Sequence, residues 1–166
     1  MTSIPLISIE ALASTHDRRT FSCGVDALDE YLRRFARQHA DANVSRTYVA
    51  VEGSTVRGFY SLAMSAIRKE NLPAKHLNRF PNFPLPVARL ARLAVEMRHQ
   101  RQGLGELLLA DALQRCLRLS VEIGMIGVIV DAKDDRARGW YERYEFDRLP
   151  DLPLTLWLPT TAIARL

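Results

Sequence analysis

One loop of this chain combines the residue types that a phosphate-binding site needs. It covers residues 100–105, Gln-Arg-Gln-Gly-Leu-Gly, between an expected strand and an expected helix. At such a junction, unpaired backbone N–H groups and the helix dipole attract an anionic diphosphate, and glycine lets a ligand approach the backbone closely. Arg98 and Arg101 add positive charge. The alternative is that Gly103 and Gly105 form only a tight turn from strand to helix.

The loop differs from two common phosphate-binding motifs. A P-loop ends in Gly-Lys-Ser/Thr, and no such triplet is present at this loop. A dinucleotide-binding fingerprint needs a third glycine where Leu108 stands. The loop is therefore either a phosphate-binding motif of another kind or only the tight turn.

Hydrophobic periodicity predicts the elements that position this loop. Strands are expected over 6–12, 46–67 (a hairpin turning at Gly53-Ser54), 87–96, 125–132 and 154–158, and helices over 27–40, 104–119 and 136–144. A long loop rich in Pro and Asn covers 69–86. The second half alternates strands and helices as a βαβα unit, which predicts a mixed α/β fold.

The first expected helix is amphipathic and has a basic outer face. Asp26 is predicted to cap its N-terminus, with Glu30 in the first turns. Leu28, Leu32 and Phe35 recur on one face at helical spacing. The arginines on the other faces are Arg33, Arg34 and Arg37.

Composition predicts an ordinary globular domain. The chain has 166 residues, 48% hydrophobic and 25% charged, which indicates a single domain over 1–166. Neither a membrane span nor a signal peptide is expected, and reduced cysteines at 23 and 116 fit a cytoplasmic location. The net charge of +4 comes mainly from arginine, which suits nucleic acid, an anionic cofactor or solubility alone.

Two motifs resemble the GCN5-related N-acetyltransferases, the GNAT family. Their acetyl-CoA-binding motif is Arg/Gln-x-x-Gly-x-Gly/Ala, and Gln100, Gly103 and Gly105 fit it. The stretch ARGWYERYEF resembles the family's A-x-x-F-Y-x-x-x-G-F helix. There Ala137, Tyr141 and Phe146 match, Trp140 replaces the phenylalanine, and Glu145 replaces the usual glycine. We expect the last change to alter the turn after the helix.

The front half of the chain resembles the GNAT toxins of bacterial toxin–antitoxin modules. It has their Phe-x-Cys-Gly start, a helix with Leu-x-x-Tyr/Trp-Leu, and Ser-Arg-Thr before the first hairpin, and the resemblance covers Leu12 to Ile163. It implies a GNAT fold, with a mixed, mostly antiparallel sheet flanked by helices and splayed at the acetyl-CoA strand. It also implies an N-acetyltransferase that blocks translation by acetylating the α-amino group of aminoacyl-tRNA. A ribbon-helix-helix antitoxin and a homodimer are further implied.

The resemblance also assigns binding roles. The backbone of Arg92–Val95 would pair with the pantetheine arm of acetyl-CoA, and the N–H near Leu93 would polarise the thioester carbonyl. The implied cofactor-binding residues are Leu93, Ala94, Val95, Gln100, Arg101, Gln102, Gly103, Leu104, Gly105, Asp131 and Ala137. The candidate tRNA contacts are Arg33, Arg34, Arg37, Lys69, Lys75, Arg79, Arg89 and Arg92. The alternatives are core packing for the apolar side chains and plain solvation for the charged ones. No metal is expected.

Tyr141 is the expected catalytic residue. A phenol, with a pKa of about 10, can donate its proton to a departing thiolate, whose thiol has a pKa of about 8.5. The alternatives are that Tyr141 only packs beside Trp140, or that Tyr144 takes the role. None of the four histidines is an obvious base. An α-amine needs little base, since its pKa of about 8 lies far below that of lysine.

Three other functions stay open on the sequence alone. One is a general GNAT that acetylates a small amine or a protein N-terminus, which the front half disfavours. Another is a catalytically silent acyl-CoA-binding regulator, which the intact Tyr141 and glycine pair disfavour. A plain nucleic-acid-binding module would leave the glycine loop unexplained. The sequence does not identify which aminoacyl-tRNA would be acetylated.

Overall fold

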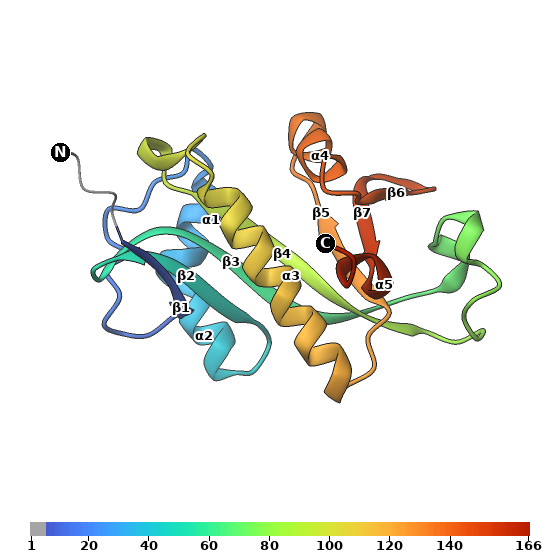
Figure 1. Ribbon diagram of the computed structural model, residues 1–166. Coiled ribbons are helices and arrows are strands. Elements are labelled where there is room, and N and C mark those ends of the chain that lie inside the picture. The colour runs from blue at the N-terminus through green and yellow to red at the C-terminus, as the bar shows by residue number, and fades with distance from the viewer. Residues whose placement is uncertain (1–5) are drawn as a thin grey trace. The chain divides into compact units, whose positions relative to one another are not determined.

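The computed structural model describes residues 6–166 (Figure 1). These residues fall into two compact units. The first unit runs to Ala63 and also includes Arg92–Ala112, and the second comprises Met64–Ala91 and Leu113–Leu166. Three long elements begin in one unit and end in the other: β3 (Thr55–Ile67), β4 (Leu85–Val95) and α3 (Leu104–Glu122). The single domain over 1–166 stays a prediction.

An antiparallel meander forms the sheet of the first unit. β1 (Ile7–Ala11) pairs with β2 (Arg46–Glu52), and β2 pairs with β3. The hairpin between β2 and β3 turns at Gly53, whose φ of 64° lies in the left-handed region that glycine adopts without strain. The hairpin predicted at this position is confirmed.

The first helix is interrupted by a wider turn. It consists of α1 (Asp26–Glu30), a π-helical turn η1 (Tyr31–Phe35) and α2 (Ala36–Asp41). The N–H of Ala36 bonds to the carbonyl of Tyr31, five residues back, and the extra residue in the turn changes which side chains face inward. Phe35 is 37% exposed as a result, so its predicted place on the apolar face is wrong.

The start of this helix also differs from the prediction. Val25 occupies the N-cap position in an extended conformation and makes no side-chain capping bond, so the predicted cap at Asp26 is wrong. Asp26 already lies in the first turn, where a negative charge favours the helix dipole. The buried Asp29 carboxylate accepts a hydrogen bond of 2.9 Å from the N–H of Cys23 and ties the preceding loop to the helix.

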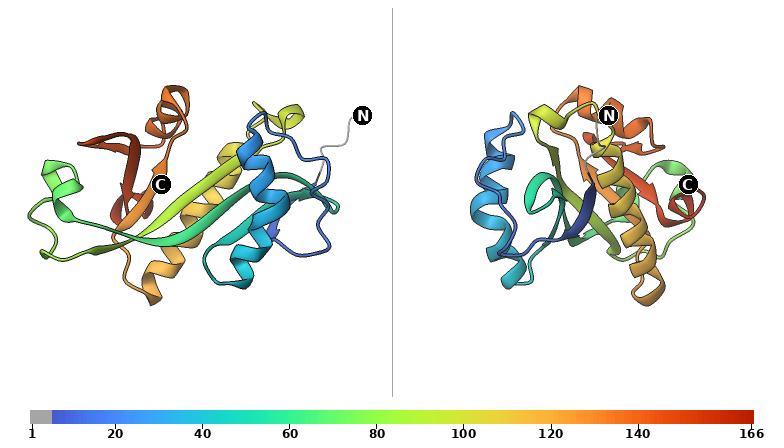
Figure 2. Two further views of the ribbon diagram at one scale, coloured as in Figure 1. Left: turned by 180° about the vertical axis from the view of Figure 1, so that it is seen from behind. Right: turned by 60° about the vertical axis from the view of Figure 1, so that its left-hand side comes forward.

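Alternate residues of β3 pack on two different helices. Phe59 shares a buried cluster with Tyr31 of the first helix. On the opposite face, a Cβ added at Gly58 would meet Leu108 Cδ1 at 2.9 Å and the Ala94 carbonyl at 3.1 Å. Figures 1 and 2 show the strands of this unit between the first helix and the start of α3. Gly58 therefore sets how closely α3 and the end of β4 approach β3.

The second unit is built on one parallel and two antiparallel strand pairs. β4 runs parallel to β5 (Gly127–Asp131), β5 pairs with β7 (Leu152–Pro159), and β7 pairs with β6 (Asp147–Leu149). Two helices, α4 (Asp135–Glu142) and α5 (Thr160–Ile163), belong to the same unit.

The Pro-rich loop of the second unit buries a histidine. Two 3-10 turns, Lys69–Asn71 and Ala74–His76, break the loop. His76 is 7% exposed, and its ring meets that of Trp157 edge-on at 4.9 Å. Neither ring nitrogen has a hydrogen-bond partner within residues 6–166. Burial, and then the charges of Lys75 and Arg79, lower the pKa of His76, which favours the neutral ring at neutral pH.

The strand order β1-β2-β3-β4-β5-β7-β6 gives a mixed, mostly antiparallel sheet. The predicted α/β class is confirmed, and so is each predicted strand and helix, with bounds shifted by a few residues. Neither Cys23 nor Cys116 forms a disulfide within residues 6–166. No helix within residues 6–166 is long and apolar enough to cross a membrane.

Candidate active site

The last residues of β4 leave their ladder with β5. The parallel register runs from Val87↔Gly127 to Leu90↔Val130, whereas β4 continues to Val95. This end of β4 holds Leu93, Ala94 and Val95, of which Ala94 is buried and the other two are half-buried. An extended ligand with amide groups could hydrogen-bond there in the manner of an added strand.

The loop after β4 alternates left-handed residues. Arg101 has a φ of 65° and Gly103 a φ of 86°. Such alternation turns successive backbone N–H groups toward one concavity, which favours an anion. A non-glycine residue in this conformation stores strain, which is commonly retained at functional sites.

The loop opens directly into the N-terminus of α3. The N–H of Leu107 bonds to the carbonyl of Gly103 at 3.1 Å, so the N–H groups of Leu104, Gly105 and Glu106 precede the helical ladder and are available to a ligand. Within residues 6–166, and apart from the two adjoining residues, no atom lies within 4 Å of a Cβ built on Gly103. The predicted phosphate-binding loop thus has an open approach, oriented N–H groups and the positive end of a nineteen-residue helix.

Two glutamine side chains hold this loop in place. The Gln100 amide nitrogen donates to the carbonyls of Cys23 at 3.0 Å and Val95 at 2.9 Å. The Gln102 amide nitrogen donates to the carbonyl of Arg98 at 3.3 Å. Gln100 therefore joins the loop to the end of β4, and a contribution of Gln100 to ligand binding would come through its backbone.

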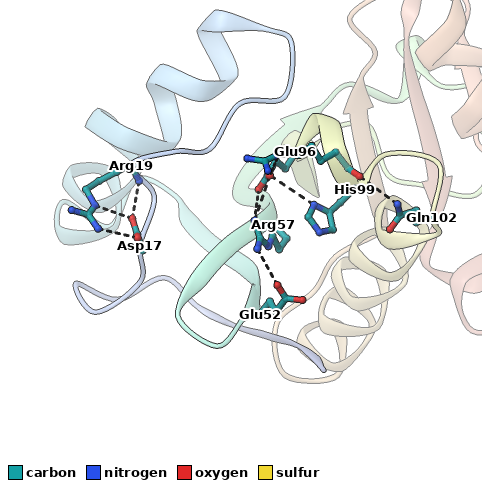
Figure 3. A network of polar contacts seen from close by, with 8 residues as sticks. Asp17, Arg19, Glu52, Arg57, Glu96, His99 and Gln102 are labelled. Carbon is teal, nitrogen blue, oxygen red and sulfur yellow. Dashed lines mark hydrogen bonds and ion pairs between the residues drawn. The ribbon is translucent and has the colours of Figure 1, made fainter. Parts of the chain in front are cut away.

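A buried carboxylate organises the junction between β4 and the loop (Figure 3). Glu96 is 4% exposed and accepts a 3.0 Å bond from Arg57, which also donates to Glu52 at 2.9 Å. The hydrogen bond to Glu52, followed by the contact with Glu96, raises the pKa of Arg57. Glu96 also lies 3.6 Å from Arg98 and 3.8 Å from His99. Sequence reasoning missed this cluster, because it requires knowing that β3 lies beside the end of β4.

Tyr141 lies on α4 in the second unit, and its side chain is 8% exposed. Its ring packs edge-on against Trp140 at 5.0 Å and Phe146 at 5.6 Å. No hydrogen bond joins the Tyr141 hydroxyl to another residue in the described part of the chain. Burial, and then the negative charge of Asp131, raise the pKa of the phenol above its ordinary value. The hydroxyl is therefore protonated at neutral pH and can act as a donor.

Asp131 is occupied by neighbours within the same unit. Its carboxylate forms an ion pair with Arg89 and accepts a 3.0 Å hydrogen bond from the Thr155 hydroxyl. Ala137 contributes its backbone N–H to the capping bond with Asp134 at 2.8 Å, which begins α4. The cofactor-binding roles of Asp131 and Ala137 stay predictions.

The turn after α4 is left-handed at Glu145. Glu145 has a φ of 71°, and its N–H bonds to the carbonyl of Glu142 at 3.1 Å. The glutamate thus adopts the left-handed conformation that glycine reaches without strain, and the expectation that Glu145 alters this turn stays a prediction. The strand predicted beyond the turn is present as β7.

The candidate tRNA contacts divide between the units. In the first, Arg33, Arg34 and Arg37 are exposed as predicted, whereas the Arg92 guanidinium lies 3.5 Å from the centre of the Tyr31 ring. In the second, Lys75 pairs with Asp147 at 3.1 Å, Arg79 lies over Phe80, and Arg89 is tied to Asp131. Lys69 lies in the first 3-10 turn. Arg89 and Arg92 are thus partly committed to internal contacts.

Comparison with known proteins decides the family. The model of the acetyltransferase (GNAT) family matches residues 10–146. The chain belongs to the GNAT acetyltransferases. It is similar to a tRNA-acetylating toxin of Mycobacterium tuberculosis, with 36% identity over 147 residues that cover 89% of this chain and 88% of the relative. It is also similar to a probable toxin TacT of Sinorhizobium fredii, with 32% identity over 161 residues that cover 91% and 89%.

Solved structures agree with this GNAT assignment. The structure of AtaT complexed with acetyl-methionyl-tRNAfMet has a TM-score of 0.91 and 27% identity, covering 96% of this chain and 98% of AtaT. A tyrosine-to-phenylalanine variant of KacT has a TM-score of 0.92 and 28% identity, with the same coverage. This GNAT chain is therefore an N-acetyltransferase that uses acetyl-CoA, and its glycine loop fits the diphosphate of that donor. No cluster of possible metal ligands occurs among residues 6–166.

Proposed function

We propose that this chain is the toxin of a toxin–antitoxin pair and acetylates the α-amino group of aminoacyl-tRNA. The observation that carries the proposal is the similarity, over nearly the whole chain, to the tRNA-acetylating toxin of M. tuberculosis. The AtaT complex with acetyl-methionyl-tRNAfMet supports an aminoacyl-tRNA as acceptor. Acetylation removes the nucleophilic amine that the next step of translation needs.

The part of the proposed site that would bind the acetyl donor belongs to the first unit. Acetyl-CoA supplies an activated acetyl thioester when it is bound. The backbone of Leu93–Val95 would bind its pantetheine amides, with the N–H near Leu93 directed at the thioester carbonyl. The residues proposed to hold the diphosphate are those of the loop, Gln100, Arg101, Gln102, Gly103, Leu104 and Gly105. The left-handed residues and the free N–H groups of α3 support this assignment.

Tyr141 is the proposed general acid. Its side chain is buried, its hydroxyl has no partner within residues 6–166, and its raised pKa keeps the proton on the oxygen. A hydroxyl donor on a buried side chain, with no competing acceptor within residues 6–166, is suited to protonate a leaving sulfur as negative charge develops there. Burial disfavours the phenolate, so Tyr141 is poorly suited to act as a base.

Proposed partners follow from the relatives. AtaT has been solved with the C-terminus of its antitoxin AtaR, and KacT in a KacTA–DNA complex. We infer a cognate antitoxin for this chain, of the ribbon-helix-helix type that the sequence resemblance implies, together with a homodimer and a cytoplasmic location.

A cell-free translation reaction tests the biological role. The purified chain with acetyl-CoA should stop protein synthesis, whereas the chain without acetyl-CoA should leave synthesis unchanged. Fresh aminoacyl-tRNA, added after removal of the chain, should restore synthesis because the ribosomes are intact. Inhibition that does not depend on acetyl-CoA would contradict the proposed function.

A further inference from the structure

A polar hollow in the first unit lies outside the loop assigned to acetyl-CoA. Its volume is about 510 Å³, and its walls come from the loop 14–19, Arg33 of the first helix and the β2–β3 turn at Ser54. Arg18, Arg19 and Arg33 line it together with Asp17 and three hydroxyl side chains. Three guanidinium groups against one carboxylate give this hollow an excess of positive charge, which favours an anion.

Backbone contacts fix the walls of the hollow. The N–H of Asp17 donates to the carbonyl of Ser54 at 2.7 Å, and the carbonyl of Asp17 accepts from the N–H of Val56 at 3.0 Å. These bonds fasten the loop 14–19 to the turn between β2 and β3. The walls are therefore positioned by the sheet, and the hollow is present before a ligand binds.

The π-helical turn helps to place Arg18, and a separate backbone contact anchors Arg33. Because the N–H of Ala36 bonds to Tyr31, the carbonyl of Leu32 does not receive its usual helical partner, and it accepts from Arg18 Nη1 at 2.8 Å instead. Arg33 Nη1 donates to the carbonyl of Phe21 at 2.6 Å.

These anchors leave most of each guanidinium free. Within residues 6–166, Arg18 and Arg33 each donate to backbone carbonyls through Nη1 alone. Neither arginine forms an ion pair with a carboxylate there. The remaining nitrogens can therefore bind an anion with two N–H groups at once.

The charges around the hollow are not balanced. Arg19 is paired with Asp17 at 3.1 Å, which uses the carboxylate of the hollow (Figure 3). Burial lowers the pKa of Arg18, and the positive charge of Arg37 lowers it further. A bound anion would relieve this repulsion between cations. The hydroxyls of Ser14, Thr15 and Ser54 offer additional donors to its oxygens.

We propose that this hollow binds a phosphate group of the RNA backbone of the acceptor substrate. The proposal rests on the proposed function, because it takes tRNA as the polyanion that presents the phosphate. Arg18 and Arg33 are the proposed contacts. Phosphate contacts of this kind position a nucleic acid and contribute salt-dependent affinity without reading its sequence.

The test measures the affinity of the full chain for aminoacylated tRNA at a series of KCl concentrations. The variants are Arg33→Gln, the double variant Arg18→Gln/Arg33→Gln, and Arg33→Lys, which keeps the charge. Arg165→Gln is the matched control: Arg165 is exposed, and its substitution removes one positive charge outside the hollow. Acetyl-CoA affinity and the urea midpoint of every variant check that the fold is retained.

The binding constant K falls as salt rises, and each lost phosphate contact should make the slope of log K against log salt shallower by about 0.9. If the affinities are equal at 1 M salt, this corresponds to roughly eightfold weaker binding at 0.1 M salt. We expect Arg33→Gln to lose about one contact and the double variant about two. Arg33→Lys should keep most of the slope, and Arg165→Gln should match the wild type. An unchanged slope for Arg33→Gln and the double variant, with the fold retained, would overturn the proposal.

A second arm separates RNA from a free anion. Inorganic phosphate is titrated into the wild type and Arg33→Gln, and its binding is followed by the shift in thermal unfolding. Arg33-dependent stabilisation by phosphate together with an unchanged tRNA slope would show a small-anion site and overturn the RNA assignment. If the wild type neither binds nor acetylates charged tRNA, the proposed function fails first, and the assignment of the hollow to RNA fails with it.

Discussion

Replacing Tyr141 by phenylalanine removes a single oxygen atom from the proposed active site. The ring contacts with Trp140 and Phe146 do not involve that oxygen, so they should persist. The hydroxyl has no hydrogen-bond partner within residues 6–166, so its removal leaves no donor or acceptor unpaired there. We therefore expect the free energy of unfolding to change by less than about 1 kcal/mol.

The effect on turnover should be much larger than the effect on stability. Positioned general acids contribute roughly 10²–10⁴-fold to rate. That range corresponds to about 3–5 kcal/mol of activation free energy. Because burial keeps the Tyr141 hydroxyl protonated, the wild type has its full complement of the acid form at neutral pH. Phenylalanine cannot supply the proton, so the whole contribution should be lost.

Three measurements on the same preparations separate these effects. Thiol release with charged tRNA, at saturating acetyl-CoA, gives kcat. Calorimetry gives the affinity for acetyl-CoA, and urea unfolding gives the stability. Tyr144→Phe is the control, because Tyr144 lies three residues further on and its ring also contacts Trp140, at 5.1 Å. We expect Tyr141→Phe to lose kcat while keeping acetyl-CoA affinity and stability, and Tyr144→Phe to keep all three.

Equal kcat in the wild type and Tyr141→Phe would refute the acid role. Loss of turnover in Tyr144→Phe alone would transfer the role to Tyr144. If Tyr141→Phe lost stability and acetyl-CoA affinity together with turnover, the hydroxyl would be structural and the reasoning from its missing partner would be wrong.

Three further predictions concern the backbone and the buried histidine. Gly58→Ala should cost about 1–3 kcal/mol, measured by urea unfolding, because its Cβ would lie 3.1 Å from the backbone carbonyl of Ala94 as well as 2.9 Å from Leu108; an unchanged midpoint would contradict the close approach. Glu145→Gly should stabilise by about 0.5–1 kcal/mol in the same assay, since it relieves a left-handed glutamate, and a loss of stability would count against strain. The pKa of His76 is lowered on folding, so wild-type stability should fall as the pH drops below 6.5, by up to about 1.4 kcal/mol per pH unit. His76→Leu should flatten that acid limb of the stability curve, and an equally steep limb would contradict a neutral buried ring.

Local patterns were enough to predict the elements that carry the proposed acetyl-CoA site. The glycine spacing of 100–105 placed a loop between a strand and a helix, and the structure has β4, that loop and α3 in this order. Apolar periodicity is set by local geometry, so long elements were recognised despite errors at their ends. β6 and α5 were missed because segments of three and four residues do not show a period.

Features that depend on long-range pairing were not predictable from the sequence. Glu96 is paired with Arg57, which lies 39 positions earlier in the chain, and Arg89 is tied to Asp131. The π-helical turn was also hidden, because YLRRF fits ordinary helical spacing. That turn changed the exposure of Phe35 and gave Arg18 a carbonyl to bind, so the hollow beside Arg33 could not be foreseen.

The most direct test of the account follows labelled acetyl from acetyl-CoA into bulk tRNA, charged in one reaction and deacylated in the other. We predict label only in the charged tRNA, released by mild base together with the amino acid, whose identity then names the substrate. Label in both tRNAs would place the acetyl group on the RNA itself and contradict acetylation of the amino acid. No label in either, with acetyl-CoA consumed by small amines, would contradict the toxin function and leave a general GNAT acetyltransferase.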